Sequence, residues 1–191
     1  MEKLADEVDA QDCPTGRTVD RRDAHDQRLP HRCVAVYVFD EQGRLYVQVH
    51  KKSQGLLDNS VGGHVDAGED YFTAARREGE EELGLHGVEY HELATGIYSD
   101  EGSYVHIFGL YECRPKGWSF VPNDEVEEII PMTLEEIVRQ MNQNPMRFTA
   151  GFICMLRAYI GLKELPLELT AHKPKKGPRK SINVKDADDR F

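Results

Sequence analysis

Residues 63–85, GHVDAGEDYFTAARREGEEELGL, concentrate acidic side chains beside a small number of apolar positions. The part from residue 71 to residue 83 contains no proline, and the residue before it, Asp70, is of a type favoured as a helix N-cap. Gly84 follows at the place where a C-cap in the left-handed conformation is expected. The stretch therefore predicts a helix over residues 71–83.

At 3.6 residues per turn this helix has two neighbouring edges, one apolar and one acidic. The apolar edge can pack on a sheet and consists of Phe72, Ala75, Gly79 and Leu83. The acidic edge carries Glu78, Glu81 and Glu82, where each like-charge pair costs about 0.2–0.5 kcal/mol. A divalent cation such as Mg²⁺, which prefers oxygen ligands and is often shared with substrate phosphates, would offset that repulsion. The alternative is a solvated acidic face without a ligand.

Composition limits the class of protein. The 191 residues are 39% hydrophobic and 30% charged, which fits one globular domain. A net charge of −10 disfavours general binding to nucleic acids or anionic membranes. The acidic N-terminus lacks an apolar signal region and no apolar run approaches the length of a membrane span, so a cytoplasmic protein is expected. The four cysteines are widely spaced without a C-x-x-C pair, which predicts reduced thiols.

The chain is expected to divide into three parts. Residues 1–30 are a polar N-terminal extension, in which a turn at Cys13–Gly16 could join two strands in a short hairpin. Residues 31–162 form the globular domain, and residues 163–191 lose apolar periodicity and are expected to be a basic, disordered tail.

Within the globular domain the pattern alternates strands and helices. Residues 33–39 direct apolar side chains to both faces, which predicts a central strand. In the strand that follows the turn at residues 40–43, one face is more hydrophilic than the other. Thr133 opens a capping-box pattern at the start of a helix. The other expected elements are extended segments at 56–65, 88–99, 104–113 and 125–131 and a helix at 148–160.

The spacing of the glycine, glutamate, arginine and leucine residues in the opening stretch resembles the Nudix box, the signature of the Nudix hydrolases. The matching positions are Gly63, Glu69, Arg77, Glu78, Glu81, Glu82, Gly84 and Leu85. The resemblance implies an α/β/α sandwich around a mixed sheet and a Mg²⁺- or Mn²⁺-dependent attack of water on a diphosphate linkage, often in a nucleoside diphosphate derivative. One position departs, because Gly79 stands where the box has a bulky aliphatic residue, and glycine costs about 1 kcal/mol in a helix relative to alanine.

The same resemblance assigns roles to the box residues. Glu78 and Glu82 would be the principal metal ligands, and Glu81 a third ligand or the group that deprotonates water. The Gly63 carbonyl could also reach the metal. Glu69 and Arg77 would form an internal pair that orients Glu78. Some members of the family take their base from outside the box, and the candidates here are Asp100, Glu101, Asp124 and Glu125.

A closer resemblance extends over about residues 8–161. The segments PTGRTVDRRDAHDQRLPHR (14–32), LLDNSVGGHVDAGE (56–69) and NPMRFTAGF (144–152) resemble Nudix proteins related to isopentenyl diphosphate isomerase. That enzyme holds its metal partly through histidines, and His25, His31 and His64 fall at or near those places, although surface or hydrogen-bonded histidines are the alternative.

The isomerase reaction needs a cysteine where this chain has Gly62, and a glutamate near Ser103. Glycine has no side chain to donate a proton, so the expected activity is hydrolysis of a small-molecule diphosphate. The alternatives are an isomerase-like enzyme and a catalytically silent ligand-binding Nudix module. A homodimer is left open.

Two further features have competing interpretations. Trp118 could stack on a flat ligand or anchor local packing. The basic residues near the C-terminus could bind RNA or act as an import signal, but such runs usually only solubilise; they are Lys173, Lys175, Lys176, Arg179 and Lys180.

Overall fold

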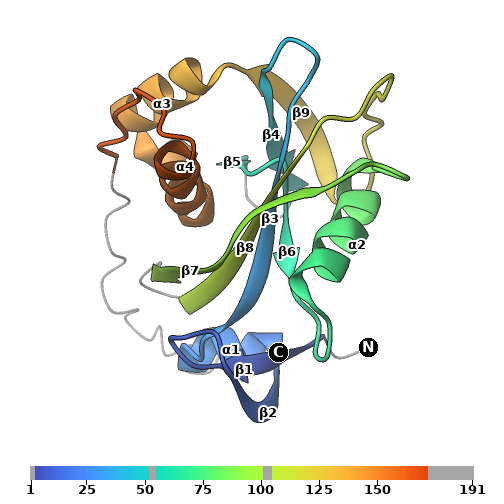
Figure 1. Ribbon diagram of the computed structural model, residues 1–191, viewed down its shortest axis with the longest axis vertical. Helices are drawn as coiled ribbons and strands as arrows, with labels where there is room; N and C mark the ends of the chain where they lie inside the picture. Colours follow the sequence, from blue (N-terminus) through green and yellow to red (C-terminus); the bar gives the residue numbers. More distant parts are fainter. Residues whose placement is uncertain (1–2, 52–54, 101–104, 172–191) are drawn as a thin grey trace, which may run out of the picture.

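The computed structural model describes residues 3–51, 55–100 and 105–171 (Figure 1). The strands are β1 (Leu4–Val8), β2 (Pro14–Asp20), β3 (His31–Val38), β4 (Leu45–His50), β5 (Leu57–Asp58), β6 (Val61–His64), β7 (His91–Asp100), β8 (Val105–Cys113) and β9 (Val126–Met132). The helices are α1 (Arg21–Gln27), α2 (Tyr71–Leu83), α3 (Leu134–Gln143) and α4 (Ala150–Leu162), with a 3₁₀ turn, η2, at Pro145–Arg147.

Strand β3 is the centre of a mixed sheet with strand order β2-β1-β3-β8-β7. It pairs in parallel with β8 along its whole length, and antiparallel with β6 from Cys33 to Val36. Its odd-numbered side chains from Cys33 enter one core cluster, and Val34, Val36 and Val38 enter the other. The predicted central strand, buried on both faces, is confirmed.

Helices cover both faces of this sheet. Figure 1 shows α2 on one side of β3 and β8, and α3 and α4 on the other. Phe152, Met155 and Leu156 of α4 belong to the first core cluster, whereas Ala74 and Ala75 of α2 belong to the second. The predicted α/β/α arrangement around a mixed sheet is confirmed.

The predicted helix over residues 71–83 is present with both of its expected ends. The Asp70 side chain accepts a hydrogen bond of 2.7 Å from the Thr73 amide. Gly84 adopts the left-handed conformation, with φ 64°, and its amide donates to the Glu80 carbonyl. At the start of α3, the Thr133 hydroxyl likewise accepts from the Glu136 amide, at 3.2 Å.

A second sheet has the order β5-β4-β9. The sequence predicted one hydrophilic face for β4, but Gln48 on that strand is only 2% exposed. The alternation of polar and apolar residues along β4 predicted a solvated side chain at Gln48. Its amide is buried instead, where it donates a hydrogen bond to a carboxylate of α2. The expectation of a wetter face is therefore wrong at this position.

The N-terminal hairpin forms, although its turn lies earlier than predicted. Strands β1 and β2 pair antiparallel, and the chain reverses over residues 9–13 while Pro14–Gly16 already belong to β2. The Asp9 carboxylate accepts from the amides of Gln11 and Cys13, both at 2.9 Å, and Asp12 has φ 64°. Asp side chains favour such turns because they bond to their own backbone and tolerate the left-handed conformation.

The structure differs from the expected boundary at the C-terminus. After α4, Leu165, Leu167 and Leu169 pack against the first core cluster, and Ala171 is buried in it. The Ala171 carbonyl accepts a 2.7 Å hydrogen bond from Arg157. The five basic tail residues lie outside the described residues. The three-part division of the chain stays a prediction, with the start of its tail moved beyond residue 171.

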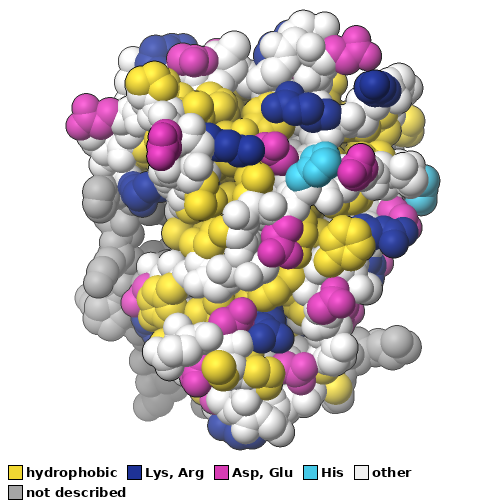
Figure 2. Space-filling model, in the orientation of Figure 1, with side chains coloured by type: hydrophobic (Ala, Val, Ile, Leu, Met, Phe, Trp, Pro, Cys, Tyr) yellow, Lys and Arg dark blue, Asp and Glu magenta, His cyan; other side chains and the backbone are white. Residues whose placement is uncertain are grey.

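The surface, the helices and the cysteines can be compared with what the composition predicts. On the face in Figure 2, basic and acidic side chains are interspersed, with apolar side chains exposed between them. None of the helices in the described part of the chain is both long and apolar enough to cross a bilayer. All four cysteines are free thiols.

Candidate functional site

Glycine at position 79 allows helix α2 to fit against Tyr90. A β-carbon on Gly79 would collide with the Tyr90 hydroxyl, which lies in the loop that leads into β7. Tyr90 thus occupies the space that the aliphatic residue of the Nudix box would take. The departure affects helix packing and leaves the acidic edge of α2 in place.

Glu78 is 7% exposed and lies directly against Gly63 of β6. A β-carbon on Gly63 would overlap the Glu78 carboxylate, so only glycine permits this approach. Arg77 Nη1 donates to Glu78 Oε1 at 2.7 Å. Burial nevertheless raises the pKa of Glu78 above its usual value, because the ion pair only partly compensates for lost hydration.

Glu82 is more deeply buried, at 2% exposed. Its Oε2 accepts hydrogen bonds from Gln48 Nε2, at 2.9 Å, and from the Gly62 amide, at 3.2 Å. Burial raises the pKa of Glu82 from 4.5 to about 8, and the neighbouring charge of Glu78 adds to the effect. Two buried carboxylates with raised pKa values therefore lie on one edge of α2. Sequence reasoning missed Gln48, since a lone glutamine in a strand carries no signal.

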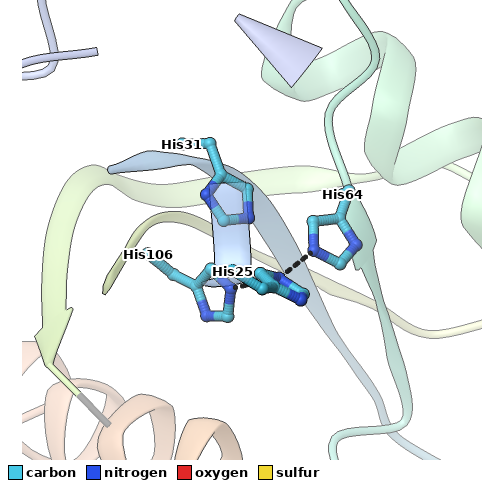
Figure 3. Close-up of side chains that lie close together, drawn as sticks. All are labelled: His25, His31, His64 and His106. Carbon is cyan, nitrogen blue, oxygen red and sulfur yellow. Dashed lines mark hydrogen bonds between the residues drawn. The ribbon is translucent and has the colours of Figure 1, made fainter. Parts of the chain in front are cut away.

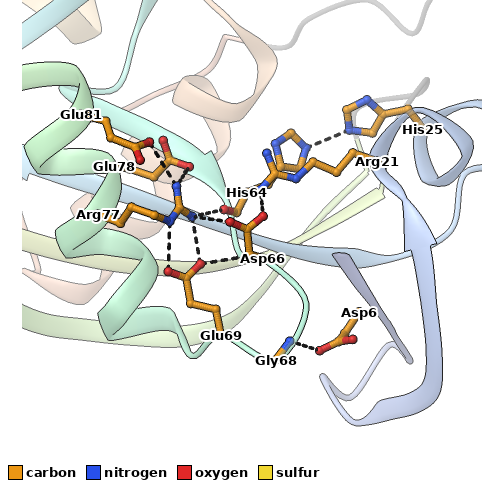
Figure 4. A network of polar contacts seen from close by, with 10 residues as sticks. All are labelled: Asp6, Arg21, His25, His64, Asp66, Gly68, Glu69, Arg77, Glu78 and Glu81. Atoms are coloured by element: carbon orange, nitrogen blue, oxygen red, sulfur yellow. Dashed lines mark hydrogen bonds and ion pairs between the residues drawn. The ribbon is translucent and has the colours of Figure 1, made fainter. Parts of the chain in front are cut away.

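Glu69 and Arg77 form the expected pair in bidentate geometry. Arg77 Nε donates to Glu69 Oε1 at 3.1 Å, and Nη2 donates to Oε2 at 2.9 Å (Figure 4). The same Nη2 donates to the His64 carbonyl at 2.9 Å. Arg77 thus ties the loop between β6 and α2 to the helix and contacts Glu78. These bonds to carboxylates raise its pKa further above its usual value.

Glu81 is far more exposed than Glu78 and Glu82. Its side chain is 54% exposed, and its carboxylate is 3.4 Å from Arg77 Nη1. An exposed carboxylate on the same helix edge is accessible to water and substrate, which suits either of the roles that the resemblance implies.

The candidate bases outside the box occupy different places. Asp100, at the end of β7, pairs with Arg28 at 3.0 Å, and Glu101 lies outside the described residues. Asp124 and Glu125 follow Asn123, whose side-chain amide donates to the Glu82 carbonyl at 2.8 Å. This hydrogen bond ties the loop with Asp124 and Glu125 to helix α2.

Trp118 serves local packing. Its indole N–H donates to the Leu83 carbonyl at 3.0 Å, and its ring meets Tyr46 edge-on with centroids 5.4 Å apart. The ring packs against the second core cluster. The packing interpretation accounts for this residue.

The three histidines singled out in the sequence come together with a fourth. His25 of α1, His31 of β3 and His64 of β6 meet His106 of β8, and one ring nitrogen from each lies within 4.8 Å of the others (Figure 3). Sequence reasoning missed His106 because it is the single histidine of the largely apolar strand β8, and only the parallel pairing of β3 with β8 places it opposite His31.

Comparison with known proteins identifies the class. The NUDIX domain family matches residues 29–152, which is more than half of the chain. Together with the α/β/α fold and the acidic edge of α2, this match shows that the chain belongs to the Nudix family.

Its relatives include proteins described as Nudix hydrolases. The Salmonella typhi protein named uncharacterized Nudix hydrolase YfcD is 36% identical over 61% of this chain and 65% of its own length, so the chain matches just under two thirds of that relative. An uncharacterized Nudix hydrolase of Streptomyces coelicolor is 37% identical over 67% of this chain and 71% of its own length. A protein named isopentenyl-diphosphate Delta-isomerase, from Serratia proteamaculans, is 29% identical over 82% of this chain and 91% of its own.

Solved structures agree with the fold. The crystal structure of DR0079 from Deinococcus radiodurans superposes with a TM-score of 0.61 at 25% identity, covering 74% of this chain and 89% of that one. The MutT protein of Methanosarcina mazei has a TM-score of 0.56 at 15% identity, over 71% and 96% of the two chains, and supports the fold alone.

Proposed function

We propose that this protein hydrolyses the diphosphate linkage of a small molecule with Mg²⁺ or Mn²⁺ as cofactor. The observation that carries the proposal is the pair of buried carboxylates on α2, Glu78 and Glu82, whose pKa values are both raised. A divalent cation bound beside them would stabilise both carboxylates in their charged form, and oxygen donors of this kind suit Mg²⁺ or Mn²⁺. Nudix hydrolase names among the relatives support the reaction class.

Each residue then has a defined task. Glu78 and Glu82 would hold the cation, with Glu81 and the Gly63 carbonyl as further ligands. Bound there, the cation would lower the pKa of water and neutralise charge on the phosphates. Glu81, being exposed, would take the proton of the attacking water, and Glu125 or Asp124 is the alternative base.

Arg77 and Glu69 position these groups without touching substrate. Because Arg77 contacts Glu78, Glu69 and the His64 carbonyl at once, it fixes the carboxylate against the loop. Gln48 and the Gly62 amide hold Glu82 in the same way.

The isomerase activity named for the Serratia proteamaculans relative is the competing proposal. Gly62 argues against it, because the position that requires a proton-donating cysteine carries no side chain. The structure pairs the Gly62 amide with Glu82, so this glycine contributes a backbone donor to the carboxylate site instead.

A screen with two readouts tests the proposal. The purified chain is incubated with nucleoside diphosphate sugars, dinucleotides, capped RNA and prenyl diphosphates, with and without Mg²⁺ or Mn²⁺, and phosphate-containing products are measured. Proton NMR follows isopentenyl diphosphate in parallel. We expect metal-dependent hydrolysis of at least one compound. Isomerisation without any hydrolysis would overturn the proposal, and binding without turnover would support the silent module.

A further inference from the structure

The N-terminal hairpin lies against the Nudix loop (residues 65–70, between β6 and α2). The loop contains a turn in which Gly68 has φ 77°, a conformation that favours glycine. From β1, the Leu4 carbonyl accepts a 3.0 Å hydrogen bond from the Ala67 amide. The Asp6 carboxylate accepts one of 2.8 Å from the Gly68 amide (Figure 4). Strand β1 thus holds two consecutive amides of the turn.

Asp66, in the same loop, joins α1 to the acidic edge of α2. Its Oδ1 pairs with Arg21 of α1, and its Oδ2 is 3.8 Å from Arg77 Nη2 (Figure 4). The Arg21 side chain is only 13% exposed, and a buried guanidinium without its carboxylate is strongly unfavourable, so this pair fixes Asp66 in place. Because Arg77 also donates to Glu78 at 2.7 Å, a chain of contacts runs from α1 to the first of the two buried glutamates.

The turn of the hairpin holds the first residue of α2. Asp12, with φ 64°, accepts hydrogen bonds from Arg32 Nε at 2.7 Å and from the Tyr71 hydroxyl at 3.1 Å. The Arg32 guanidinium also lies over the Tyr71 ring, 5.3 Å from its centroid. The same ring contacts Gly109 of β8, where a β-carbon would come within 2.7 Å of it. Tyr71 is therefore held by the hairpin, β3 and β8 at once.

Helix α2 transmits the position of its first residue to the acidic edge. Successive residues of a helix are related by about 100° and 1.5 Å, so the placement of Tyr71 sets the directions in which Glu78 and Glu82 point. Glu78 fills the space beside Gly63, and Glu82 accepts from Gln48 at 2.9 Å. Close-packed interiors leave little room for a rotated helix, so both contacts depend on how α2 begins.

We infer that residues 3–28 form a clamp that positions the Nudix loop and the start of α2, with Asp6 and Asp12 as its positioning residues. The consequence for metal binding rests on the proposed function, because the acidic edge that the clamp orients is the proposed cation site. The NUDIX family match begins at residue 29, so the clamp precedes the matched region. The N-terminal segment is then part of the working unit, and its two aspartates act through the loop backbone and through Tyr71.

Four variants of the full chain test the clamp. Asp6→Ala removes the acceptor for the Gly68 amide, whereas Asp6→Asn retains an oxygen there and should restore the wild-type behaviour. Asp12→Gly removes the second carboxylate, and glycine adopts φ 64° without strain, so the turn keeps its backbone. Asp26→Ala is the matched control, since Asp26 is an exposed aspartate of α1 in the same segment.

Amide hydrogen exchange, followed by NMR in the metal-free protein, reports on the loop. The Asp66 amide donates to Glu69 Oε2, and the Glu69 amide donates to the Asp66 carbonyl, both at 2.9 Å. Neither bond involves the clamp, so a change there shows that the loop has loosened. We expect both amides to exchange about 10-fold faster in Asp6→Ala, as local opening becomes easier, and at the wild-type rate in Asp6→Asn and Asp26→Ala.

Asp12→Gly should loosen the first turn of α2 instead. The Thr73 amide donates to the Asp70 carboxylate at 2.7 Å, and the Ala74 amide donates to the Asp70 carbonyl at 3.0 Å. Both amides should exchange about 10-fold faster in this variant than in the wild type. If Asp12→Gly fails to fold, Tyr71→Phe replaces it, because it removes the hydroxyl and keeps the ring that contacts Gly109.

Mg²⁺ affinity, measured by calorimetry on folded protein, links the clamp to the acidic edge. Loss of a residue that supports a metal ligand costs about 10–100-fold in affinity, and the clamp acts one contact further away, so we expect about 10-fold weaker binding in Asp6→Ala and Asp12→Gly. Asp6→Asn and Asp26→Ala should bind Mg²⁺ like the wild type. A segment that only adds global stability would lower the melting temperature and leave this affinity unchanged.

Wild-type exchange rates, or wild-type Mg²⁺ affinity, in both Asp6→Ala and Asp12→Gly would overturn the inference. A wild-type protein that binds no Mg²⁺ would overturn the proposed function, and the clamp would then be judged by amide exchange alone. The two failures are therefore distinguishable, and none of the readouts depends on turnover.

Discussion

Replacement of Glu82 by glutamine tests whether the acidic edge of α2 binds a metal or is only a solvated surface. The change removes one negative charge and keeps the shape of the side chain. Glutamine at this position retains an oxygen that can accept from the Gly62 amide and from Gln48. Local packing should therefore persist, and the effect should come from charge.

The metal-free protein should become more stable. With a pKa of 4.5 when unfolded and about 8 when folded, Glu82 holds its proton more tightly in the native state. Its contribution to stability is therefore complete below pH 4.5 and is lost as pH rises toward 8. At pH 7 the loss is about 3 kcal/mol at most, which corresponds to roughly 5–10 °C in melting temperature for a domain of this size. Glutamine does not titrate, so the variant should escape that loss.

The metal-bound protein should respond in the opposite sense. Mg²⁺ at 100 times its dissociation constant adds about 2.7 kcal/mol to the free energy of unfolding, or about 5–10 °C. Glu82→Gln should lose most of this increment and its hydrolytic activity. Glu78→Gln should behave alike.

Melting curves between pH 5 and pH 8, with and without Mg²⁺, measure both effects. Glu80→Gln is the matched control, since it makes the same chemical change on the same helix at a half-exposed position. Equal Mg²⁺ shifts in the wild type and Glu82→Gln would refute the metal site. A metal-free Glu82→Gln protein that melts below the wild type at pH 7 would refute the argument from burial.

Three other predictions follow from packing. Arg77→Ala should lower the melting temperature with and without Mg²⁺, because it removes the bidentate partner of Glu69; a normal metal-free melting temperature would contradict this. Gly79→Ala should lower the free energy of unfolding by about 1–3 kcal/mol, because the alanine methyl group meets the Tyr90 hydroxyl. The loss should be smaller in a Tyr90→Phe background, and denaturant unfolding of the four proteins of the double-mutant cycle would show this. A chain ending at Ala171 should melt like the full protein, whereas one ending at Leu162 should melt several degrees lower because it uncovers the first core cluster; equal melting of the two would exclude a role for residues 163–171.

The elements near the site could be predicted from local signals. Helix α2 has its N-cap at Asp70 and its left-handed glycine at Gly84, and both act within one turn of the chain. The double alternation of β3 likewise specified a strand buried on both faces, because side chains of a strand point alternately to its two sides. The Glu69–Arg77 pair was predictable because a resemblance in spacing already implied it.

Long-range contacts were not accessible in this way. Gln48 looks like a solvated position of β4 until α2 places Glu82 beside it. Residues 165–169 lack helical periodicity, yet alternate leucines pack on the core because the segment folds back against α3 and α4, where Asn142 and Arg157 hydrogen-bond to its end.

The sequence by itself determined the acidic edge of α2, since residue type and helical spacing are local properties. That Gly63 makes room for Glu78 was decided by the packing of β6 against α2. The tertiary structure alone decided that His106 joins His25, His31 and His64. A single histidine in an apolar strand carries no pattern, and its partners come from three other elements that meet only when β8 pairs with β3 and β3 pairs with β6.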